Sequence, residues 1–374
     1  MLFCAAGGLG HLQPLLPLAE QAAAVGHEVM VSGAAALQDY VTGQGLRFVA
    51  AGPELVTNLT PLTLYDIEHE RAAIGRHFIG RLGPPRARDL IALGQGWPAD
   101  LIVRDEADYG AVVAAEVLGI PHATVVVSAA GGFIRQQDIE APLAQLRATF
   151  ALDPGEGVAA LHRYLTLNRL PPSFRDPSDP LPGPVVAYRQ DPPPRATAKD
   201  AKRVYVTLGT IFNTESGDLL ARTVRATAAA TTVGEVFVAT GEHVDPAELG
   251  PLPNHVVAER FAEQREVLTR CSAVVSHAGS GTVHDALEQG LPQVCLPLGA
   301  DQTLNAGRCA ELGLGIVLAA DTVSHDDIAH AVNDVLTTPG YRHAAERLQA
   351  EIQHLPELDT AVSALESLCP QSAV

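Results

Sequence analysis

Long hydrophobic runs and early basic residues are missing from this chain of 374 residues. No apolar stretch approaches the roughly 20 residues that a membrane-spanning helix needs. The first basic residue is Arg47, so the positively charged start of a signal peptide is also missing. The sequence therefore predicts a cytoplasmic protein with no membrane partner.

Positive charge is scarce throughout. Lys and Arg number 25 against 43 Asp and Glu, which gives a formal net charge of −18 at pH 7. Nucleic-acid binders present basic faces to the phosphate backbone, so this balance argues against a nucleic-acid partner. A small phosphorylated ligand is not excluded, because a few local donors suffice to hold it. The sequence also leaves a homodimer open.

Metal-binding spacings are missing as well. No DxD lies between apolar strands, and no His, Asp or Glu cluster stands at ligand spacing. The 5 cysteines show neither CxxC nor the Cys/His spacing of zinc sites. We therefore expect a reduced protein without a metal or other cofactor. The cysteines are Cys4, Cys271, Cys295, Cys309 and Cys369.

Apolar residues are plentiful, at 47% of the chain, and they fall into two similar halves. Each half alternates short Val, Ile and Leu runs with helical patterns, which is typical of parallel strands covered on both faces. A proline-rich stretch at 171–202 separates the halves. We expect an α/β protein of two facing, Rossmann-like domains with the ligand crevice between the carboxyl ends of the two sheets.

The predicted elements follow from these patterns. The expected strands are 1–6, 28–32, 47–50, 101–103 and 122–127, then 203–207, 235–239, 273–276, 293–296 and 315–318. The expected helices are 12–25, 35–42 and 109–118, then 217–230, 264–271, 281–289, 302–312 and 324–337, and two further pieces beyond residue 342. Ser324 and Asp327 have the spacing of a capping box.

The most informative motif is the segment 276–282, Ser-His-Ala-Gly-Ser-Gly-Thr, between an expected strand and an expected helix. A glycine-rich turn before a helix presents free N–H groups and the positive end of the helix dipole, which suits a phosphate. His277 could donate to a phosphate oxygen, and Ser280 and Thr282 could add hydroxyls. The alternative is an ordinary turn with Thr282 as the helix cap.

Two further segments accompany this motif. Asp301-Gln302 follows the next strand, where a carboxylate and an amide could pair with several hydroxyls of a polyol. The alternative is a helix cap, because Asp is a favoured cap residue. Phe261 could stack on a base, although a lone Phe more commonly packs in a core.

In the first half, His11 follows the turn Gly7-Gly8-Leu9-Gly10 at the expected start of the first long helix. A helix dipole disfavours the imidazolium there, and a neutral His can act as a general base. Asp105 is the candidate carboxylate that orients it, with a helix cap before residue 109 as the alternative. Glu106 and Asp108 stand close enough in sequence to be confused with it.

Together these motifs resemble the family 1 glycosyltransferases of the GT-B fold. Segment 261–302 resembles the donor-binding signature, 8–14 resembles the N-terminal GxGHxxP loop, and 208–210 resembles the first loop of the second domain. The resemblance covers nearly the whole chain and is strongest to actinobacterial enzymes that attach deoxysugars to natural products. It implies domains at 1–190 and 203–341, a linker at 191–202, and helices at 342–374 that return to the first domain.

The resemblance also implies roles for individual residues. Phe261 would stack on the base and the backbone of Ala262 would read its edge, Asp285 would hold the ribose hydroxyls, and Asp301 and Gln302 would bind the sugar. His11 would be the catalytic base and Asp105 its partner. The diphosphate would lie among the remaining donor-site residues, which are Gly10, Thr210, His277, Gly279, Ser280, Gly281 and Thr282.

The implied function is an inverting, metal-independent hexosyltransferase that moves a sugar from a nucleotide diphosphate, thymidine diphosphate by resemblance, to a small apolar aglycone. Two departures from the family pattern stand out. Phe261-Ala262-Glu263-Gln264 replaces Trp-x-Pro-Gln, and Ala278 replaces the first glycine of His-Gly-Gly. The acceptor is expected in loops at about 52–96 and 128–174, whose apolar residues either bind it or pack the domain. The aromatic candidates are Phe78, Trp97, Phe133 and Phe150.

Other functions remain as alternatives. A nicotinamide-dependent oxidoreductase would need a third glycine where Leu12 and Gln13 stand. A nucleotide-sugar epimerase or a lipid-linked sugar transferase would share the fold, but the basic patch expected of the latter is missing. A non-catalytic helper subunit would have no need of His11, Asp105, His277 and Asp301 together.

Overall fold

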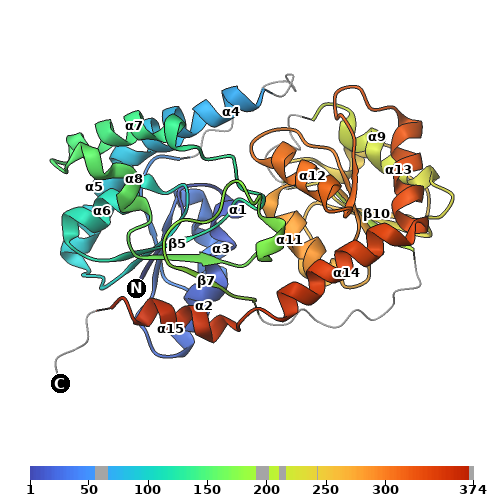
Figure 1. Cartoon of the computed structure of the whole chain (residues 1–374). Helices are drawn as coiled ribbons and strands as arrows, with labels where there is room; N and C mark the ends of the chain where they lie inside the picture. Colours follow the sequence, from blue (N-terminus) through green and yellow to red (C-terminus); the bar gives the residue numbers. More distant parts are fainter. Residues whose placement is uncertain (55–65, 191–201, 210–215, 242, 370–374) are drawn as a thin grey trace.

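The computed structural model describes residues 1–54, 66–190, 202–209, 216–241 and 243–369. Two parallel β-sheets, each covered by helices, stand side by side in it (Figure 1). The α/β class and the pair of Rossmann-like domains predicted from the sequence are confirmed. Among the described residues, none of the helices combines the length and apolar character that crossing a bilayer requires.

The first sheet has 7 strands in the order β3-β2-β1-β4-β5-β6-β7. Every neighbouring pair in it is parallel. Its strands are β1 (Leu2–Cys4), β2 (Met30–Gly33), β3 (Phe48–Ala50), β4 (Ile102–Asp105), β5 (His122–Val125), β6 (Leu165–Asn168) and β7 (Val185–Ala187).

The second sheet has 6 strands in the order β10-β9-β8-β11-β12-β13, also parallel throughout. Its strands are β8 (Arg203–Thr207), β9 (Glu235–Ala239), β10 (Val256–Glu259), β11 (Ala273–Ser276), β12 (Gln293–Cys295) and β13 (Gly315–Val317). The apolar runs predicted as strands in both halves are strands in the structure, with ends that agree with the prediction to within two residues.

Both sheets change direction of strand order at one point. In the first, the chain passes from β1 outward to β2 and β3, then returns to β4 on the other side of β1. In the second, the chain passes from β8 outward to β9 and β10, then returns to β11 on the other side of β8. Loops at the carboxyl ends of strands on either side of such a switch point splay apart and leave room for a ligand. The motifs at His11, Asp105 and 276–282 all lie at these two switch points.

The first long helix is broken, contrary to prediction. The sequence predicted one helix over 12–25, whereas the structure has the single turn α1 (Leu9–Leu12) and a separate α2 (Leu16–Ala24). Pro14 and Pro17 cause the break, because neither can donate the N–H that a continuous helix would require. His11 therefore lies in the last turn of a short helix and not at the start of a long one.

The stretches expected as acceptor loops are largely helical, so the loop prediction was wrong. They form a layer over the first sheet, whose core includes Ile79, Val113, Phe133 and Leu143 (Figure 1). The longest helices of this domain are α5 and α7, with 14 residues each, and α6, with 10. The helices are η1 (Ala35–Leu37), α3 (Gln38–Gly43), α4 (Ile67–Ala73), the π-helix η2 (Ile74–Leu82), α5 (Gly83–Gly96), α6 (Tyr109–Leu118), α7 (Gln136–Thr149), η3 (Pro154–Glu156), α8 (Gly157–Leu161) and η4 (Pro172–Phe174).

The helices of the second domain agree more closely with prediction. The capping box of Ser324 and Asp327 is present, with both reciprocal hydrogen bonds. The helices are α9 (Leu219–Ala229), η6 (Pro246–Leu249), α10 (Gln264–Leu268), α11 (Ser280–Glu288), α12 (Gln302–Glu311) and α13 (His325–Thr337).

The last two helices connect the domains. Helix α14 (Pro339–Gln353) starts on the second domain and runs toward the first, and α15 (Leu358–Glu366) lies against α2 (Figure 1). Leu358, Val362 and Leu365 are buried in the same apolar core as β1 and α2. The interruption predicted near Pro356 falls between these helices. Of the predicted linker 191–202, only Lys202 lies among the described residues.

Candidate active site

A histidine and an aspartate meet at the switch point of the first sheet. His11, beyond β1, places its Nδ1 atom 3.1 Å from Oδ1 of Asp105, the last residue of β4. The side chain of His11 is 27% exposed and that of Asp105 is fully buried. The structure thus joins the two residues that the sequence proposed as base and partner.

Asp105 is firmly held in place. Its Oδ2 accepts a hydrogen bond from the Ala6 amide at 2.7 Å, and its Oδ1 accepts one from the Ala107 amide at 2.7 Å. Burial alone would raise the pKa of this carboxyl, but His11 and the two amides together hold that pKa below its usual range. Asp105 is therefore a fixed, ionised group that orients the imidazole.

The neighbouring carboxylates have other partners. Glu106 accepts hydrogen bonds from the amides of Val127 and Ser128. Asp108 caps α6 through the Ala111 amide and pairs with Arg86 at 2.6 Å. The helix cap considered for Asp105 is thus supplied by Asp108.

The pKa of His11 is shifted in the direction opposite to the one that the sequence argument gave. Burial alone would lower its pKa, but the negative charge of Asp105 and the hydrogen bond to it outweigh burial and raise the pKa above its ordinary value of 6.5. The dipole argument was wrong because His11 lies at the end of a single helical turn. Its Nδ1–H donates to Asp105 in the orientation that suits this pair, which leaves the Nε2 lone pair to accept a proton.

We expect the Asp105→Asn variant to move the acid limb of the pH–kcat profile to lower pH. Removing the carboxylate leaves burial as the dominant influence, so the pKa of His11 falls and the ring stays neutral at lower pH. The plateau rate falls about ten- to a hundredfold, because the ring loses its orienting partner. Rate profiles of parent and variant test this, and an unchanged acid limb would refute the assignment of Asp105 as the partner.

The His11 ring is closely packed against Phe78 and Gly7. Phe78, from the π-helix η2, stacks on the imidazole with ring centroids 5.5 Å apart and planes inclined by 29°. A Cβ at Gly7 would lie 2.1 Å from Cδ2 of His11, so only glycine is tolerated there. Phe78, predicted as an acceptor contact, is thus brought to the candidate base.

The other aromatic candidates lie elsewhere. Trp97 donates to Glu28 at 3.0 Å and lies under Arg47. These two residues lie just before β2 and β3, so Trp97 lies at the amino ends of the strands, whereas His11 lies at their carboxyl ends. Its assignment to the acceptor site was wrong. Phe133 is buried and Phe150 partly buried in the core of the helical layer, which is the packing alternative.

In the second domain, His277 follows β11 at the equivalent switch point. A Cβ at Gly209 would lie 2.6 Å from its Nε2 atom, and a Cβ at Gly279 would lie 2.5 Å from the same atom. Burial lowers the pKa of His277 to about 4, so the ring is neutral near pH 7. Its Nδ1 is buried without a partner among the described residues. A neutral donor between two glycines suits a closely approaching anion.

The start of α11 offers backbone donors to such an anion. Residues 280–282 form its first turn, whose N–H groups lack helical partners. The hydroxyls of Ser280 and Thr282, predicted to bind the diphosphate, already donate to protein partners. Ser280 donates to Asp301 at 2.5 Å, and Thr282 donates to Gln264 at 3.2 Å. The cap is Gly279, without a side-chain bond, so the alternative role of Thr282 as cap was also wrong.

Asp301 and Gln302 lie at the start of α12. Asp301 has its Oδ2 bonded to Ser280 and Asn305, while burial, the dominant influence, raises its pKa above the usual range. Oε1 of Gln302 accepts from the amides of Leu298 and Gly299, so its amide nitrogen is the part that could donate to a ligand. The negative charge of Asp301 helps to raise the pKa of His11, although the two residues belong to different domains.

The candidate nucleoside contacts lie beside α11. Phe261 is 54% exposed in the loop after β10, so it is not a core aromatic, and Ala262 is partly buried beside it. Asp285 is buried, and its oxygens are bonded to Gln264 at 2.6 Å and His284 at 3.3 Å. Gly10 and Gly281 have open space where a Cβ would stand. Thr210 lies outside the described residues.

One potential metal cluster contradicts the expectation that no such grouping exists. In the described part of the chain, ligand atoms of His284, Asp285 and Glu288 lie within 4.8 Å of one another. The sequence argument missed it because two adjacent residues and one a helical turn later converge on one face of α11. Glu288 pairs with Arg265 at 3.1 Å and His284 lies 3.2 Å from the Arg169 carbonyl, so these atoms already have protein partners.

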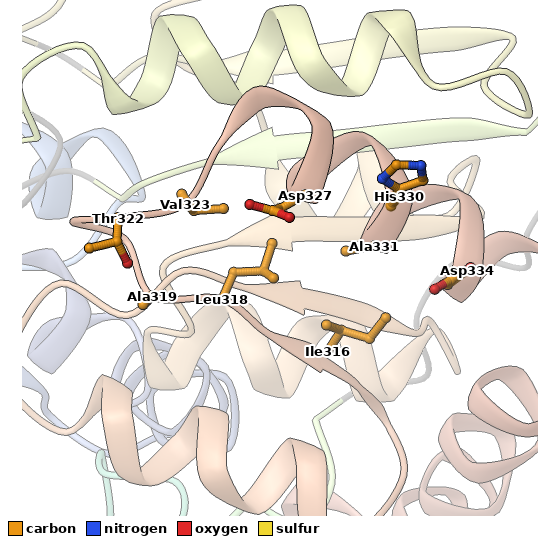
Figure 2. Close-up of a pocket in the computed structure, with 9 residues that line it drawn as sticks. All are labelled: Ile316, Leu318, Ala319, Thr322, Val323, Asp327, His330, Ala331 and Asp334. Atoms are coloured by element: carbon orange, nitrogen blue, oxygen red, sulfur yellow. The ribbon is translucent and has the colours of Figure 1, made fainter.

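A separate hollow of about 350 Å³ lies between β13 and α13. Figure 2 shows Asp327, His330 and Asp334 of α13 facing Ile316 and Leu318 across it. None of the predicted site residues lines this hollow, and it belongs to the outer edge of the second sheet. It is therefore distinct from the switch-point site.

Comparison with known proteins agrees with this geometry. The family "Erythromycin biosynthesis protein CIII-like, C-terminal domain" matches residues 225–368. The elloramycin glycosyltransferase ElmGT of Streptomyces olivaceus is 32% identical, with 95% of this chain and 94% of that protein covered. The chain belongs to the actinobacterial antibiotic glycosyltransferases. The structure of CalG4, the calicheamicin glycosyltransferase, has the same fold, with a TM-score of 0.81 at 24% identity, covering 100% of this chain and 98% of CalG4.

A second solved relative carries a nucleotide. SsfS6 of Streptomyces sp. SF2575, complexed with thymidine diphosphate, matches with a TM-score of 0.76 at 25% identity over 98% of this chain and 99% of that one. The family relationship predicted from the motifs is thus confirmed, and so is the GT-B fold. This glycosyltransferase is an enzyme, which removes the helper-subunit and oxidoreductase alternatives.

Sequence reasoning missed two residues that organise the glycosyltransferase site. Asn305 is fully buried and bonds to Asp301, Ser280 and the Ala278 carbonyl. Gln264 bridges Asp285 and Thr282. Spacing offered a signal for Asn305 only, because it lies one helical turn after Asp301 on the same face of α12.

Proposed function

We propose that this glycosyltransferase moves a deoxysugar from thymidine diphosphate to a hydroxyl of a small apolar aglycone, with inversion and without a metal ion. The observation that carries the proposal is the pairing of a His–Asp dyad with an anion-binding turn across the two switch points. The thymidine diphosphate bound to SsfS6 and the elloramycin activity of ElmGT support the donor and acceptor classes.

In the proposed reaction, Nε2 of His11 takes the proton of the acceptor hydroxyl. The acceptor oxygen forms a bond to the anomeric carbon while the bond from that carbon to the phosphate oxygen breaks. One displacement inverts the configuration. Asp105 holds the ring through Nδ1 and stabilises the imidazolium that forms, as in other base–carboxylate pairs.

The leaving diphosphate gains negative charge as the bond breaks. We assign the N–H groups at the start of α11 and a ring N–H of His277 to that charge, because such donors stabilise it without a cation. Asp301, with its Oδ1 free of the contacts that Ser280 and Asn305 make to Oδ2, is assigned to the sugar hydroxyls. The exposed Phe261 is assigned to the base.

The test is a thermal shift with thymidine, uridine, guanosine and adenosine diphosphates. A ligand at one hundred times its dissociation constant adds about 2.7 kcal/mol to the free energy of unfolding. We expect thymidine diphosphate to give the largest shift in the parent. In His277→Ala the same shift needs about tenfold more ligand, because one donor to the diphosphate is lost.

The control is His325→Ala, which removes a half-exposed histidine at the start of α13 and should leave nucleotide affinity unchanged. No shift with any diphosphate in the parent would refute the proposed donor. Equal affinity of parent and His277→Ala would remove His277 from the diphosphate site while leaving the donor class intact.

A further inference from the structure

Three polar side chains of the second domain, Ser280, Asp301 and Asn305, form a cluster in which Asn305 is buried and the other two are partly buried. Ser280 donates to Oδ2 of Asp301 at 2.5 Å, and Nδ2 of Asn305 lies 3.0 Å from the same oxygen. Nδ2 of Asn305 also lies 3.1 Å from the Ser280 hydroxyl. Asp301 is thereby fixed by α11 and by its own helix α12.

The same cluster is bonded to the first domain. The Ala129 amide donates to the Ser280 hydroxyl at 2.7 Å, and the Ala130 amide donates to Oδ1 of Asn305 at 3.0 Å. Both alanines follow β5 and are buried. The side-chain oxygens of Ser280 and Asn305 thus each accept a hydrogen bond from a main-chain amide of the first domain.

The segment that carries these amides is also tied toward the catalytic dyad. The two preceding amides, of Val127 and Ser128, donate to Glu106, which directly follows Asp105. The four consecutive N–H groups of residues 127–130 therefore link the cluster in the second domain to Glu106, next to Asp105 at the end of β4.

We propose that Ser280 and Asn305 are positioning residues that orient Asp301 toward the sugar only while they hold the amides of Ala129 and Ala130. This rests on the proposed function, in which Asp301 binds sugar hydroxyls. It replaces the assignment of the Ser280 hydroxyl to the diphosphate, because that hydroxyl donates to Asp301 and accepts from the first domain. Sugar recognition and contact between the domains then depend on the same two side chains.

The test separates sugar recognition from diphosphate binding in Ser280→Ala and Asn305→Ala. We expect the KM for the intact nucleotide sugar to rise about tenfold, because Asp301 loses a hydrogen bond that fixes it. The dissociation constant of thymidine diphosphate, measured by calorimetry, stays unchanged. If both constants rise together, Ser280 is a diphosphate ligand and the inference is wrong. If neither rises, it is also wrong.

A second measurement needs no donor. Hydrogen exchange of a peptide spanning 126–134 should accelerate in both variants, because one of its amides loses its acceptor in each, Ala129 in Ser280→Ala and Ala130 in Asn305→Ala. Exchange in α13 should stay as in the parent. Unchanged exchange in that peptide would overturn the inference even if Asn305→Ala proved poorly folded, because Ser280→Ala is the milder change.

The matched control is Ser324→Ala, which also removes a serine that makes two local hydrogen bonds at a helix start, but at α13. It should lower the melting temperature without changing KM or the exchange of 126–134. Failure of the parent to bind thymidine diphosphate would refute the proposed donor. Diphosphate binding that weakens only in the Ser280 variant would refute this inference and leave the donor standing.

Discussion

The His11→Ala variant is expected to lose about 10²- to 10⁴-fold in kcat, because the acceptor hydroxyl would have no base to take its proton. That loss corresponds to about 3 to 5 kcal/mol of transition-state stabilisation. Thymidine diphosphate should bind as in the parent, since His11 belongs to the first domain and the proposed diphosphate donors belong to the second. Steady-state kinetics and calorimetry on the same preparation check both statements.

The comparison variant for this experiment is His325→Ala, on the remote helix α13, which should turn over like the parent. Equal turnover by parent and His11→Ala would sink the base assignment. A loss of nucleotide affinity in His11→Ala would instead show that the ring contacts the donor.

The Asp108→Asn variant is expected to lose about 3 to 5 kcal/mol of folding free energy, because it leaves the charge of Arg86 buried without its counter-ion. The pair is fully enclosed, with side-chain exposures of 3% for Arg86 and 0% for Asp108. Arg86 also donates to the carbonyls of Ala51 at 2.8 Å and Ser32 at 3.2 Å, so it joins two strand ends to the start of α6. Asparagine still caps the helix, so the loss reports the charge pair.

Denaturant unfolding measures the loss of folding free energy, and thermal unfolding should show a fall in melting temperature on the order of 10 °C. Asp138→Asn is the control, because its pair with Arg135 is partly exposed and contributes at most about 1 kcal/mol. A loss in Asp108→Asn no larger than in the control would show that the buried pair adds little. Loss of turnover confined to Asp108→Asn, and not seen in Asp105→Asn, would mean that the wrong carboxylate was assigned to His11.

Sequence reasoning located the sheets because their strands are continuous apolar runs buried on both faces. The strand of residues 273–276 and the glycine turn after it are legible for this reason. Three strands were missed. β6 is buried throughout, but its residues Leu-Thr-Leu-Asn alternate apolar with polar and so give no continuous apolar run. β7 has an exposed residue and β10 alternates at the sheet edge, so neither gives a clear buried run. The helical layer over the first sheet was missed because Gly75, Pro84, Pro85 and Pro142 interrupt its pattern.

The sequence predicted which residues form the candidate site, but not the hydrogen bonds that join them. Motif order placed His11, Asp105, His277 and Asp301 at strand ends, and a switch point brings strand ends together. No spacing rule shows that the Ser280 hydroxyl faces Asp301 and the Ala129 amide instead of a phosphate. Contacts between segments more than 150 residues apart depend on how the domains meet, which the local pattern does not encode.

The crossing of α15 onto the first domain has a consequence for recombining such enzymes. The core around β1 and α2 is completed by Leu358, Val362 and Leu365, which follow the second domain in the sequence. A chimera joined only in the stretch 191–202 would therefore insert a foreign helix into the host's first core. Exchanging the sugar-binding half as a cassette requires two junctions, one in that stretch and one between α14 and α15, so that each core keeps its own helix.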